Sequence, residues 1–159
     1  RFCHQTYPGS IVQKPQCFLP SRLKFDRVLL DTPCTASGLM RRYKTHIKKW
    51  HYHNLEPLLK RQKKLLSHAI KLLKPEGVLV YSTCSIEPEE NESNIQFALD
   101  THTNIHLEDI TIIKNFKTRE GLTSWQDKVF SPEMKKTMRI YPQDEGTEGF
   151  FIARIRKVE

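Results

Sequence analysis

The sequence lacks four features that would each indicate a class of protein. Its four cysteines, Cys3, Cys17, Cys34 and Cys84, include no Cys-x-x-Cys pair, so neither a zinc knuckle nor a disulfide framework is indicated. No apolar run approaches the ~18 residues of a membrane span, and the start has no signal-peptide pattern. We therefore expect an intracellular protein without a membrane partner, cytoplasmic in the first instance, with a nuclear or nucleolar location left open. The six glycines form no glycine-rich loop.

Acidic residues are in the minority. The chain of 159 residues has 26 lysines and arginines against 18 aspartates and glutamates, which gives a formal net charge of +8. Such a field attracts polyanions and favours a nucleic-acid partner, although a generally basic soluble protein fits the charge equally well. With 38% hydrophobic residues, the chain is long enough for one packed core.

The order of apolar segments predicts an α/β fold. The run Val28-Leu29-Leu30 is typical of a buried parallel strand. Apolar residues at three- and four-residue steps from Leu55 to Leu73 predict an amphipathic helix, ended by the segment 74–77. The other expected elements are a strand at 78–81, a helix from about 88 to 99, one or two strands within 105–113, a long insertion at 115–136 and a closing strand at 149–155.

Two of these strands run into polar segments that contain a cysteine. Asp31-Thr32-Pro33-Cys34 follows the first strand and Ser82-Thr83-Cys84-Ser85 follows the second. In open α/β sheets, ligands bind beyond the carboxyl ends of the strands. If the two strands are neighbours, Cys34 and Cys84 face one crevice. The alternative is that both are small buried residues at strand ends.

These motifs resemble a known family. The segments 25–34 and 73–92, together with Gly38, closely resemble the RNA 5-methylcytosine methyltransferases of the NOL1/NOP2/Sun family, above all their archaeal tRNA-modifying branch. The resemblance resumes at 139–142 and 149–153. It implies that residues 25–159 are the C-terminal half of a Rossmann-like class I sheet that uses S-adenosylmethionine. Residues 1–24 would then be an irregular lead-in from a missing upstream half.

The resemblance also implies a reaction and roles for three residues. Such enzymes transfer a methyl group from S-adenosylmethionine to carbon 5 of cytosine in RNA, with tRNA the expected substrate. The family's nucleophile matches Cys84, and the cysteine that assists product release matches Cys34. Asp31 would contact the cytosine and lie near the cofactor, or else only cap its turn. Spacing alone leaves the nucleophile open, because DNA enzymes use a Pro-Cys cysteine for the same attack on carbon 6.

The surroundings of Cys84 have opposing effects on its thiol. A position before a helix N-terminus lowers a thiol pKa, whereas the carboxylates of Glu87, Glu89 and Glu90 raise it. We interpret these three acids as stabilising the first helical turn rather than as taking part in catalysis.

The expected RNA contacts are Arg41, Arg42 and Lys44, which are interleaved with aromatic residues in the stretch 41–52, and Arg139, by resemblance. The lysines of 60–71 are interpreted as a solvated helix face. His46, His51 and His53 lack a second ligand pair, so no metal site is predicted. Relatives often have histidine where this chain has Gln143, so a role of that histidine is not carried over.

The family's glycine-rich cofactor loop would lie before Arg1. We therefore expect an upstream half, in cis or as a second chain, to complete the sheet, and an exposed apolar edge without it. Three alternatives remain open: a basic RNA-binding module without catalysis, a methyltransferase for ribosomal RNA, and a DNA methyltransferase whose nucleophile is Cys34.

Overall fold

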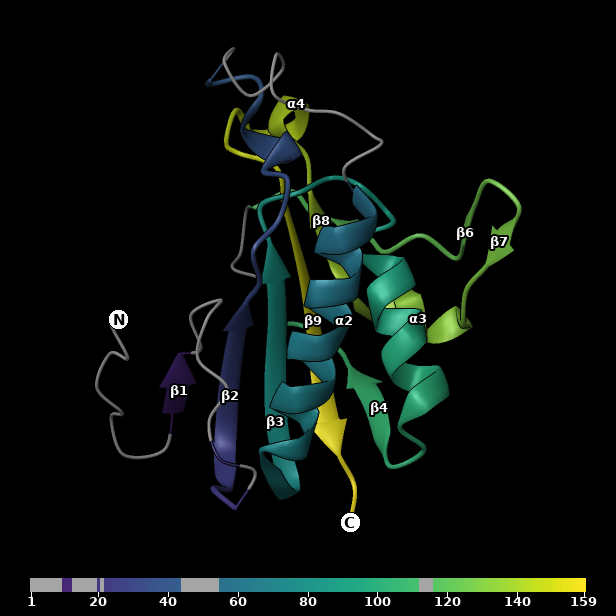
Figure 1. Cartoon of the computed structure of the whole chain (residues 1–159). Helices are drawn as coiled ribbons and strands as arrows, with labels where there is room; N and C mark the ends of the chain where they lie inside the picture. Colours follow the sequence, from purple (N-terminus) through teal and green to yellow (C-terminus); the bar gives the residue numbers. More distant parts are fainter. Residues whose placement is uncertain (1–9, 13–19, 21, 44–54, 112–115) are drawn as a thin grey trace.

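The protein is described from a computed structural model that covers residues 10–12, 20, 22–43, 55–111 and 116–159. These residues form a seven-stranded mixed sheet in the order β1-β2-β3-β9-β8-β5, with β4 paired to β9, and a separate ribbon of β6 and β7 (Figure 1). The strands are β1 (Ser10–Val12), β2 (Phe25–Asp31), β3 (Leu73–Thr83), β4 (Ile105–Glu108), β5 (Arg119–Glu120), β6 (Ser124–Trp125), β7 (Lys128–Val129), β8 (Met138–Ile140) and β9 (Phe150–Lys157). The helices are α2 (Leu55–Lys71), α3 (Glu92–Thr101) and α4 (Pro142–Glu145), with short 3-10 turns η1 (Ser37–Leu39) and η3 (Pro132–Lys136).

The α/β class expected from the sequence is confirmed. The two cysteine-bearing strands are neighbours, which was the condition for Cys34 and Cys84 to face one crevice. β2 and β3 are parallel neighbours, paired from Arg27 with Val78 to Asp31 with Ser82. Both strands therefore end at the same edge of the sheet. The loops that follow them start side by side, which is the arrangement a ligand site requires.

β3 is longer than the sequence predicted. The segment 74–77, expected only to end the helix, lies inside the strand as a bulge: Phe25 pairs with Leu73, but Arg27 already pairs with Val78. Glu76 has a φ of 61° in this bulge. A proline and a left-handed residue interrupt the ladder without ending the strand.

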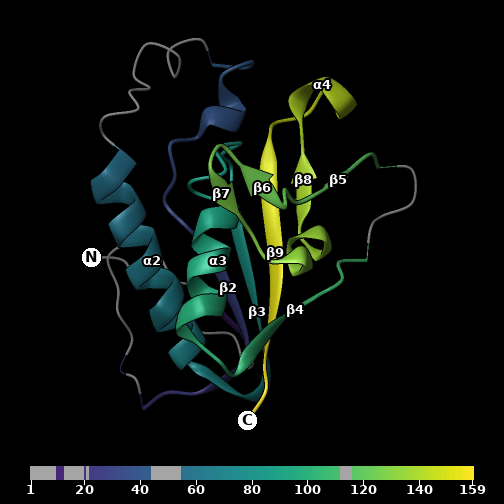
Figure 2. The same cartoon turned by 90° about the vertical axis from the view of Figure 1, so that its right-hand side faces the viewer.

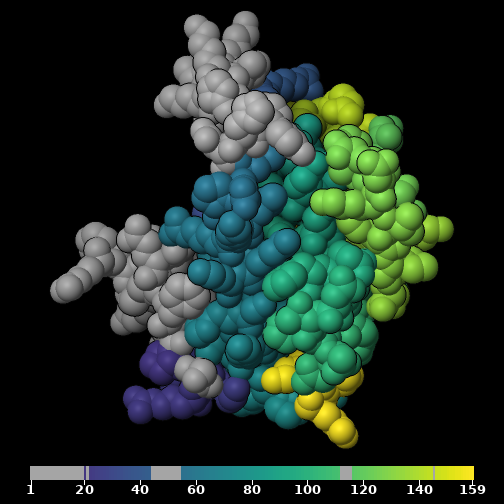
Figure 3. All heavy atoms as spheres, turned by 45° about the vertical axis from the view of Figure 1, so that its right-hand side comes forward, coloured from purple at the N-terminus to yellow at the C-terminus, as the bar shows by residue number. Residues whose placement is uncertain are grey.

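The amphipathic helix is confirmed as α2, which ends at Lys71. Its buried stripe includes Leu65, Leu66, Ala69 and Ile70, which share one core with the residues of β2, β3 and β9 that face the helices. Burying a leucine or isoleucine side chain stabilises the fold by about 1.5–3 kcal/mol. The helix therefore anchors one face of the sheet, with α3 beside it (Figures 2 and 3).

The closing strand β9 lies in the middle of the sheet. One edge pairs with β3, while the other edge pairs with β8 at residues 150–152 and with β4 at residues 154–157. Phe151, Ala153 and Ile155 are fully buried on the helix side. This central position fixes the loop that precedes β9 next to the end of β3.

Several boundaries differ from the expectations. The lead-in 1–24 contains β1, which pairs in parallel with β2, and three residues are too few for a periodic signal. Pro88 precedes α3 in a separate turn, and the helix itself begins at Glu92. The insertion 115–136 contains β5, β6, β7 and η3.

The opposite face of the sheet has exposed apolar surface. Successive residues of a strand point to opposite faces, and Leu29, between the buried Val28 and Leu30, is 40% exposed. Among the described residues, no helix is long and apolar enough to cross a membrane.

Candidate active site

The two cysteines at the strand ends are in contact. The Sγ atoms of Cys34 and Cys84 lie 3.1 Å apart, and both residues are part-buried. The sequence predicted that they face one crevice, and the geometry brings the thiols within hydrogen-bond distance. Such a pair can share one proton, so that one sulfur is a thiolate and the other a thiol donor.

The shared hydrogen bond separates the two thiols chemically. Donation from Cys34 lowers the pKa of the Cys84 thiol, against the effects of burial and of the Asp31 charge, which raise it. The same bond, with burial, raises the pKa of Cys34. Of the three acids expected to oppose ionisation of Cys84, Glu90 contributes a small effect of that sign. Cys84 is therefore the sulfur that ionises first.

Asp31 ends β2 with an exposed side chain. Its Oδ1 accepts a hydrogen bond from the Ser82 hydroxyl at 3.2 Å, from the neighbouring strand. The carboxylate thus stays accessible at the edge where the two cysteine loops begin, that is, the loop with Cys34 after β2 and the loop with Cys84 after β3. An accessible acceptor there can receive an N–H or O–H group of a ligand.

Backbone hydrogen bonds that join Gly38 to Cys84 and to Gly149, called the Gly38 crossing below, hold the cysteine loops together. The Gly38 N–H donates to the Cys84 carbonyl at 3.0 Å, and the Gly149 N–H donates to the Gly38 carbonyl at 2.9 Å. A Cβ atom on Gly38 would lie 2.4 Å from the Gly149 oxygen and 2.8 Å from the Cys84 oxygen. Only glycine fits at this position, which explains why Gly38 belongs to the motif.

Serine side chains add a second set of links. The Ser37 and Ser85 hydroxyls lie 3.0 Å apart, and the Ile86 N–H donates to the Ser37 hydroxyl at 3.0 Å. Beneath them, the carboxylate of Glu90 is fully buried and accepts hydrogen bonds from both cysteine loops. Glu90 was interpreted from the sequence only as stabilising a helix, because no linear pattern indicates which distant loops a side chain will reach.

Arg139 was expected to contact RNA, and the structure corrects this prediction. Its side chain is 2% exposed and forms a bidentate ion pair with the fully buried Glu92, from Nε at 2.6 Å and Nη2 at 2.5 Å. Its Nη1 donates to the Ile86 carbonyl at 2.9 Å and to the Tyr141 hydroxyl at 3.1 Å. A guanidinium buried in this way has no surface for a phosphate, so Arg139 joins β8 to α3 and to the second cysteine loop.

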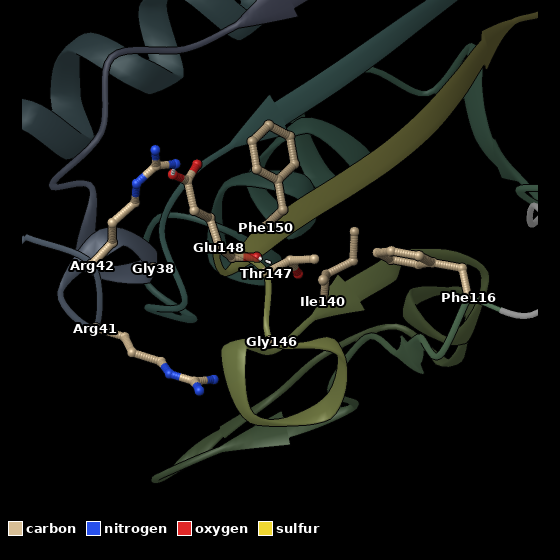
Figure 4. A pocket seen from close by; sticks show the side chains of 9 residues that line it. All are labelled: Gly38, Arg41, Arg42, Phe116, Ile140, Gly146, Thr147, Glu148 and Phe150. Atoms are coloured by element: carbon tan, nitrogen blue, oxygen red, sulfur yellow. Dashed lines mark hydrogen bonds and ion pairs between the residues drawn. The ribbon is translucent and has the colours of Figure 1, made fainter.

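Arg41 and Arg42 line a pocket of about 690 Å³ next to the Gly38 crossing (Figure 4). Arg41 donates to the Pro142 carbonyl at 2.6 Å, and Arg42 pairs with Glu148 at 2.9 Å. The other lining residues are Gly38, Phe116, Ile140, Gly146, Thr147 and Phe150. The pocket thus combines cationic, acidic and aromatic groups. Lys44, also expected to contact RNA, lies outside the described residues.

The three histidines that raised the question of a metal, His46, His51 and His53, also lie outside the described residues. Within the part of the chain that the structure covers, no group of three or more histidine, cysteine, aspartate or glutamate side chains is arranged to hold a metal ion.

The sequence is similar to a family of RNA methyltransferases over most of its length. A family model for the 16S rRNA methyltransferases RsmB/F matches residues 10–156. The tRNA (cytosine(49)-C(5))-methyltransferase of Pyrococcus abyssi is 44% identical over 133 residues, which cover 84% of this chain and 42% of that protein. The 25S rRNA (cytosine-C(5))-methyltransferase nop2 of Schizosaccharomyces pombe is 37% identical over 138 residues, covering 84% of this chain and 22% of that protein.

Solved structures have the same fold. A methyltransferase homolog protein from Pyrococcus horikoshii has a TM-score of 0.71 at 40% identity, covering 86% of this chain and 40% of that one. NSun6 from the same organism, solved with SFG, has a TM-score of 0.69 at 36% identity, covering 86% and 31%. The chain therefore spans less than half the length of these relatives. On the family match across residues 10–156 and these identities, the chain belongs to the RsmB/F family of methyltransferases, the NOL1/NOP2/Sun family.

Proposed function

We propose that this chain is the cysteine-bearing part of an S-adenosylmethionine-dependent RNA cytosine-5 methyltransferase that acts on tRNA. The observation that carries the proposal is the thiol pair of Cys34 and Cys84, 3.1 Å apart at the carboxyl ends of β2 and β3. Methylation of carbon 5 needs a thiolate to activate the ring and a second group to complete the release. This pair supplies both from adjacent strands.

In the first step, the Cys84 thiolate adds to carbon 6 of cytosine. The new S–C6 bond moves the ring's electron pair towards carbon 5, which becomes nucleophilic like an enamine. The hydrogen bond from Cys34 that favours the Cys84 thiolate supports this assignment.

In the second step, the electron pair at carbon 5 would take the methyl group from the sulfonium of bound S-adenosylmethionine, whose S–CH3 bond would break to leave the neutral thioether. A base then removes the proton from carbon 5. The electron pair of that C–H bond re-forms the ring double bond as the S–C6 bond breaks, and Cys84 leaves as a thiolate. Cys34 assists this release, since its sulfur is next to the bond that breaks. Asp31 accepts from the exocyclic amine of the cytosine.

S-adenosylmethionine supplies an electrophilic methyl group on a sulfonium when it is bound. The residues present fit one side of such a site: Asp31 offers an accessible carboxylate at the carboxyl end of β2. The SFG bound in the NSun6 structure is an analogue of this cofactor, which supports the assignment. The six glycines of the chain provide no glycine-rich loop, so other residues must complete the site.

We propose that the portion the relatives have beyond this chain completes the sheet, in cis or as a second chain. The exposed Leu29 on the face opposite α2 and the short edge strand β1 give that portion a surface to cover. RNA is proposed to lie along Arg41 and Arg42, whose pocket adjoins the cysteine loops. We further propose that the protein acts in the cytoplasm, with tRNA favoured by the 44% identity to the Pyrococcus abyssi enzyme and rRNA as the second candidate from nop2.

The test is methyl transfer from labelled S-adenosylmethionine to unmodified tRNA and rRNA. The chain is assayed alone and with the remaining portion of the Pyrococcus abyssi relative added in trans. Incorporation into tRNA only with the added portion is the expected result. RNA binding without incorporation in either mixture would instead identify a binding module without catalysis, and labelling of Cys34 in an adduct would reverse the roles of the two cysteines.

A further inference from the structure

We propose that Glu90 is a positioning residue that holds the thiols of Cys34 and Cys84 at hydrogen-bond distance. The proposal rests on the function proposed above. Glu90 is fully buried, and its carboxylate lies beneath both cysteine loops rather than against the sulfur atoms. It therefore acts through the loops and not on the reacting atoms.

Four donors converge on this carboxylate. Oε2 accepts from the backbone N–H of Thr35 at 3.0 Å and from Nε2 of Gln62 at 2.8 Å. Oε1 accepts from the hydroxyls of Thr35 at 2.5 Å and of Ser85 at 2.6 Å. An ionised carboxylate only accepts hydrogen bonds, so it matches a site that presents four donors.

The donors belong to the residues that follow the two cysteines. Thr35 comes directly after Cys34, and Ser85 directly after Cys84. A single side chain therefore fixes each loop one residue from its thiol. Hydrogen bonds to an ionised group are about twice as strong as neutral ones, so this clamp is stiffer than the hydroxyl contacts around it.

Gln62 of α2 extends the clamp to the helix. Its Nε2 also donates to the Pro33 carbonyl at 2.8 Å, and its Oε1 accepts from Asn94 Nδ2 at 2.7 Å. The second contact fixes which end of the Gln62 amide faces Glu90. The first cysteine loop is thereby tied to α2 and, through Asn94, to α3. Ser85 of the second loop reaches Thr35 through the Glu90 carboxylate and also by a direct hydroxyl contact at 3.3 Å.

The two carboxylate oxygens tolerate different replacements. Oε2 faces N–H groups, which can only donate, whereas Oε1 faces hydroxyls, which can rotate and accept. A glutamine at position 90 can therefore keep its carbonyl towards Thr35 N and Gln62 while its amide donates to the hydroxyls. Glu90→Gln should preserve the clamp in weakened form, and Glu90→Ala should remove it.

The first measurement is the pH dependence of Cys84 alkylation by iodoacetamide in this chain, followed by peptide mass spectrometry. The charge of Glu90 raises the pKa of Cys84, and the bond from Cys34 lowers it with a larger effect. Loss of charge alone would move the alkylation midpoint down. Loss of positioning separates the sulfurs and moves it up. We expect an upward shift in Glu90→Ala and a return towards the wild-type midpoint in Glu90→Gln; an unchanged or lowered midpoint in Glu90→Ala overturns the proposal.

A second variant keeps the test decisive if Glu90→Ala does not fold. Thr35→Val combined with Ser85→Ala removes the two hydroxyl donors and leaves the charge of Glu90, so an upward shift is again expected and an unchanged midpoint contradicts positioning. Glu89→Ala is the matched control. It lies in the same turn, is 8% exposed, and bonds to Trp125 Nε1 at 3.1 Å rather than to a cysteine loop.

Turnover separates this proposal from the proposed function. With the complementing portion present, Glu90→Ala should lower kcat about 100-fold, as expected for a displacement of about 1 Å, while KM for RNA changes less than about twofold. If the wild type transfers no methyl group, the proposed function fails, and the alkylation shift alone decides the role of Glu90. If the wild type is active and Glu90→Ala leaves either the alkylation midpoint or kcat unchanged, positioning by Glu90 is excluded.

Discussion

The sulfur atoms of Cys34 and Cys84 lie 3.1 Å apart although 50 positions separate them in the chain. The parallel pairing of β2 and β3 makes this contact possible, because it brings the ends of two distant strands to one edge. The contact also makes the pKa values of the two thiols unequal, since one thiol donates the hydrogen bond and the other ionises. The predictions on the two cysteines follow from this inequality.

Replacement of either cysteine should block a different step. Cys84→Ala removes the attacking sulfur and should lower methyl transfer by on the order of 10³-fold or more. Cys34→Ala leaves the attack possible and impairs release, so a covalent protein–RNA adduct should accumulate. Denaturing gels with labelled RNA measure the adduct. An adduct in Cys84→Ala that is absent from Cys34→Ala would contradict the assignment.

The ionisation of Cys84 should depend on its neighbours with predictable sign. The bond from Cys34 stabilises the thiolate, so Cys34→Ala should raise the pKa of Cys84 and move its alkylation midpoint to higher pH. The charge of Asp31 raises that pKa, so Asp31→Asn should move the midpoint to lower pH. Iodoacetamide labelling across pH 6–10 checks both; shifts of the same sign in the two variants would refute this account.

The buried ion pair of Arg139 and Glu92 should be important for stability. Arg139→Met leaves the carboxylate of Glu92 unpaired in the core, which should cost about 3–5 kcal/mol of unfolding free energy. Urea denaturation followed by circular dichroism measures this. Lys74→Met, which breaks the exposed pair with Asp26, is the matched control and should change stability little. Weaker RNA affinity in Arg139→Met without loss of stability would restore the original RNA-contact interpretation.

Gly38 should not tolerate a side chain. A methyl group there meets the Gly149 and Cys84 carbonyl oxygens, so Gly38→Ala should destabilise the fold by about 1–3 kcal/mol and reduce methyl transfer. Gly146→Ala is the control, since no atom lies within 4 Å of its added Cβ and only the φ of 69° opposes it. Equal melting temperatures for the two variants would show that the backbone around Gly38 moves to accept the added methyl group and would contradict this prediction.

Arg41 and Arg42 should contribute to RNA affinity through phosphate contacts. The double variant Arg41→Met/Arg42→Met should weaken tRNA binding and reduce the slope of log K against log salt by about one to two. Filter binding between 50 and 200 mM salt gives that slope. Arg22→Met is the control. Arg22 lies before β2, at the opposite end of that strand from Cys34, so its replacement should leave the slope unchanged. An unchanged slope in the double variant would remove these arginines from the interface.

The parts of the structure with a repeating pattern were predictable from the sequence. The apolar stripe of α2 follows from its three- and four-residue period, and the helix is confirmed. The continuous apolar run of β2 predicted a buried parallel strand; the parallel strand is confirmed, but Leu29 within it is 40% exposed. The meeting of Cys34 and Cys84 followed from a general rule of α/β sheets together with two polar strand ends. Hydrophobic patterns along the chain and one rule about the strand ends of α/β sheets were therefore sufficient to predict these elements.

Contacts between distant segments were not predictable in this way. Nothing near Arg139 indicated that Glu92 would neutralise it, so a basic residue close to the site was interpreted as an RNA contact. Glu90 was interpreted from its place before a helix, whereas its partners Thr35 and Gln62 come from elements far away in the chain. The bulge in β3 was missed because proline and glycine usually end an element, and here they only shift its register.

The central place of β9 has a consequence for how the protein forms during synthesis. The ribosome releases β2, β3 and both cysteine loops before it releases β9. However, β9 is the strand that pairs with β3, and Gly149, directly before β9, is the residue that bonds to Gly38. Until then, the unpaired edge of β3 is open to wrong partners. A nascent chain therefore lacks both the pairing of this β3 edge and the Gly149 bond to Gly38 until β9 has been synthesised.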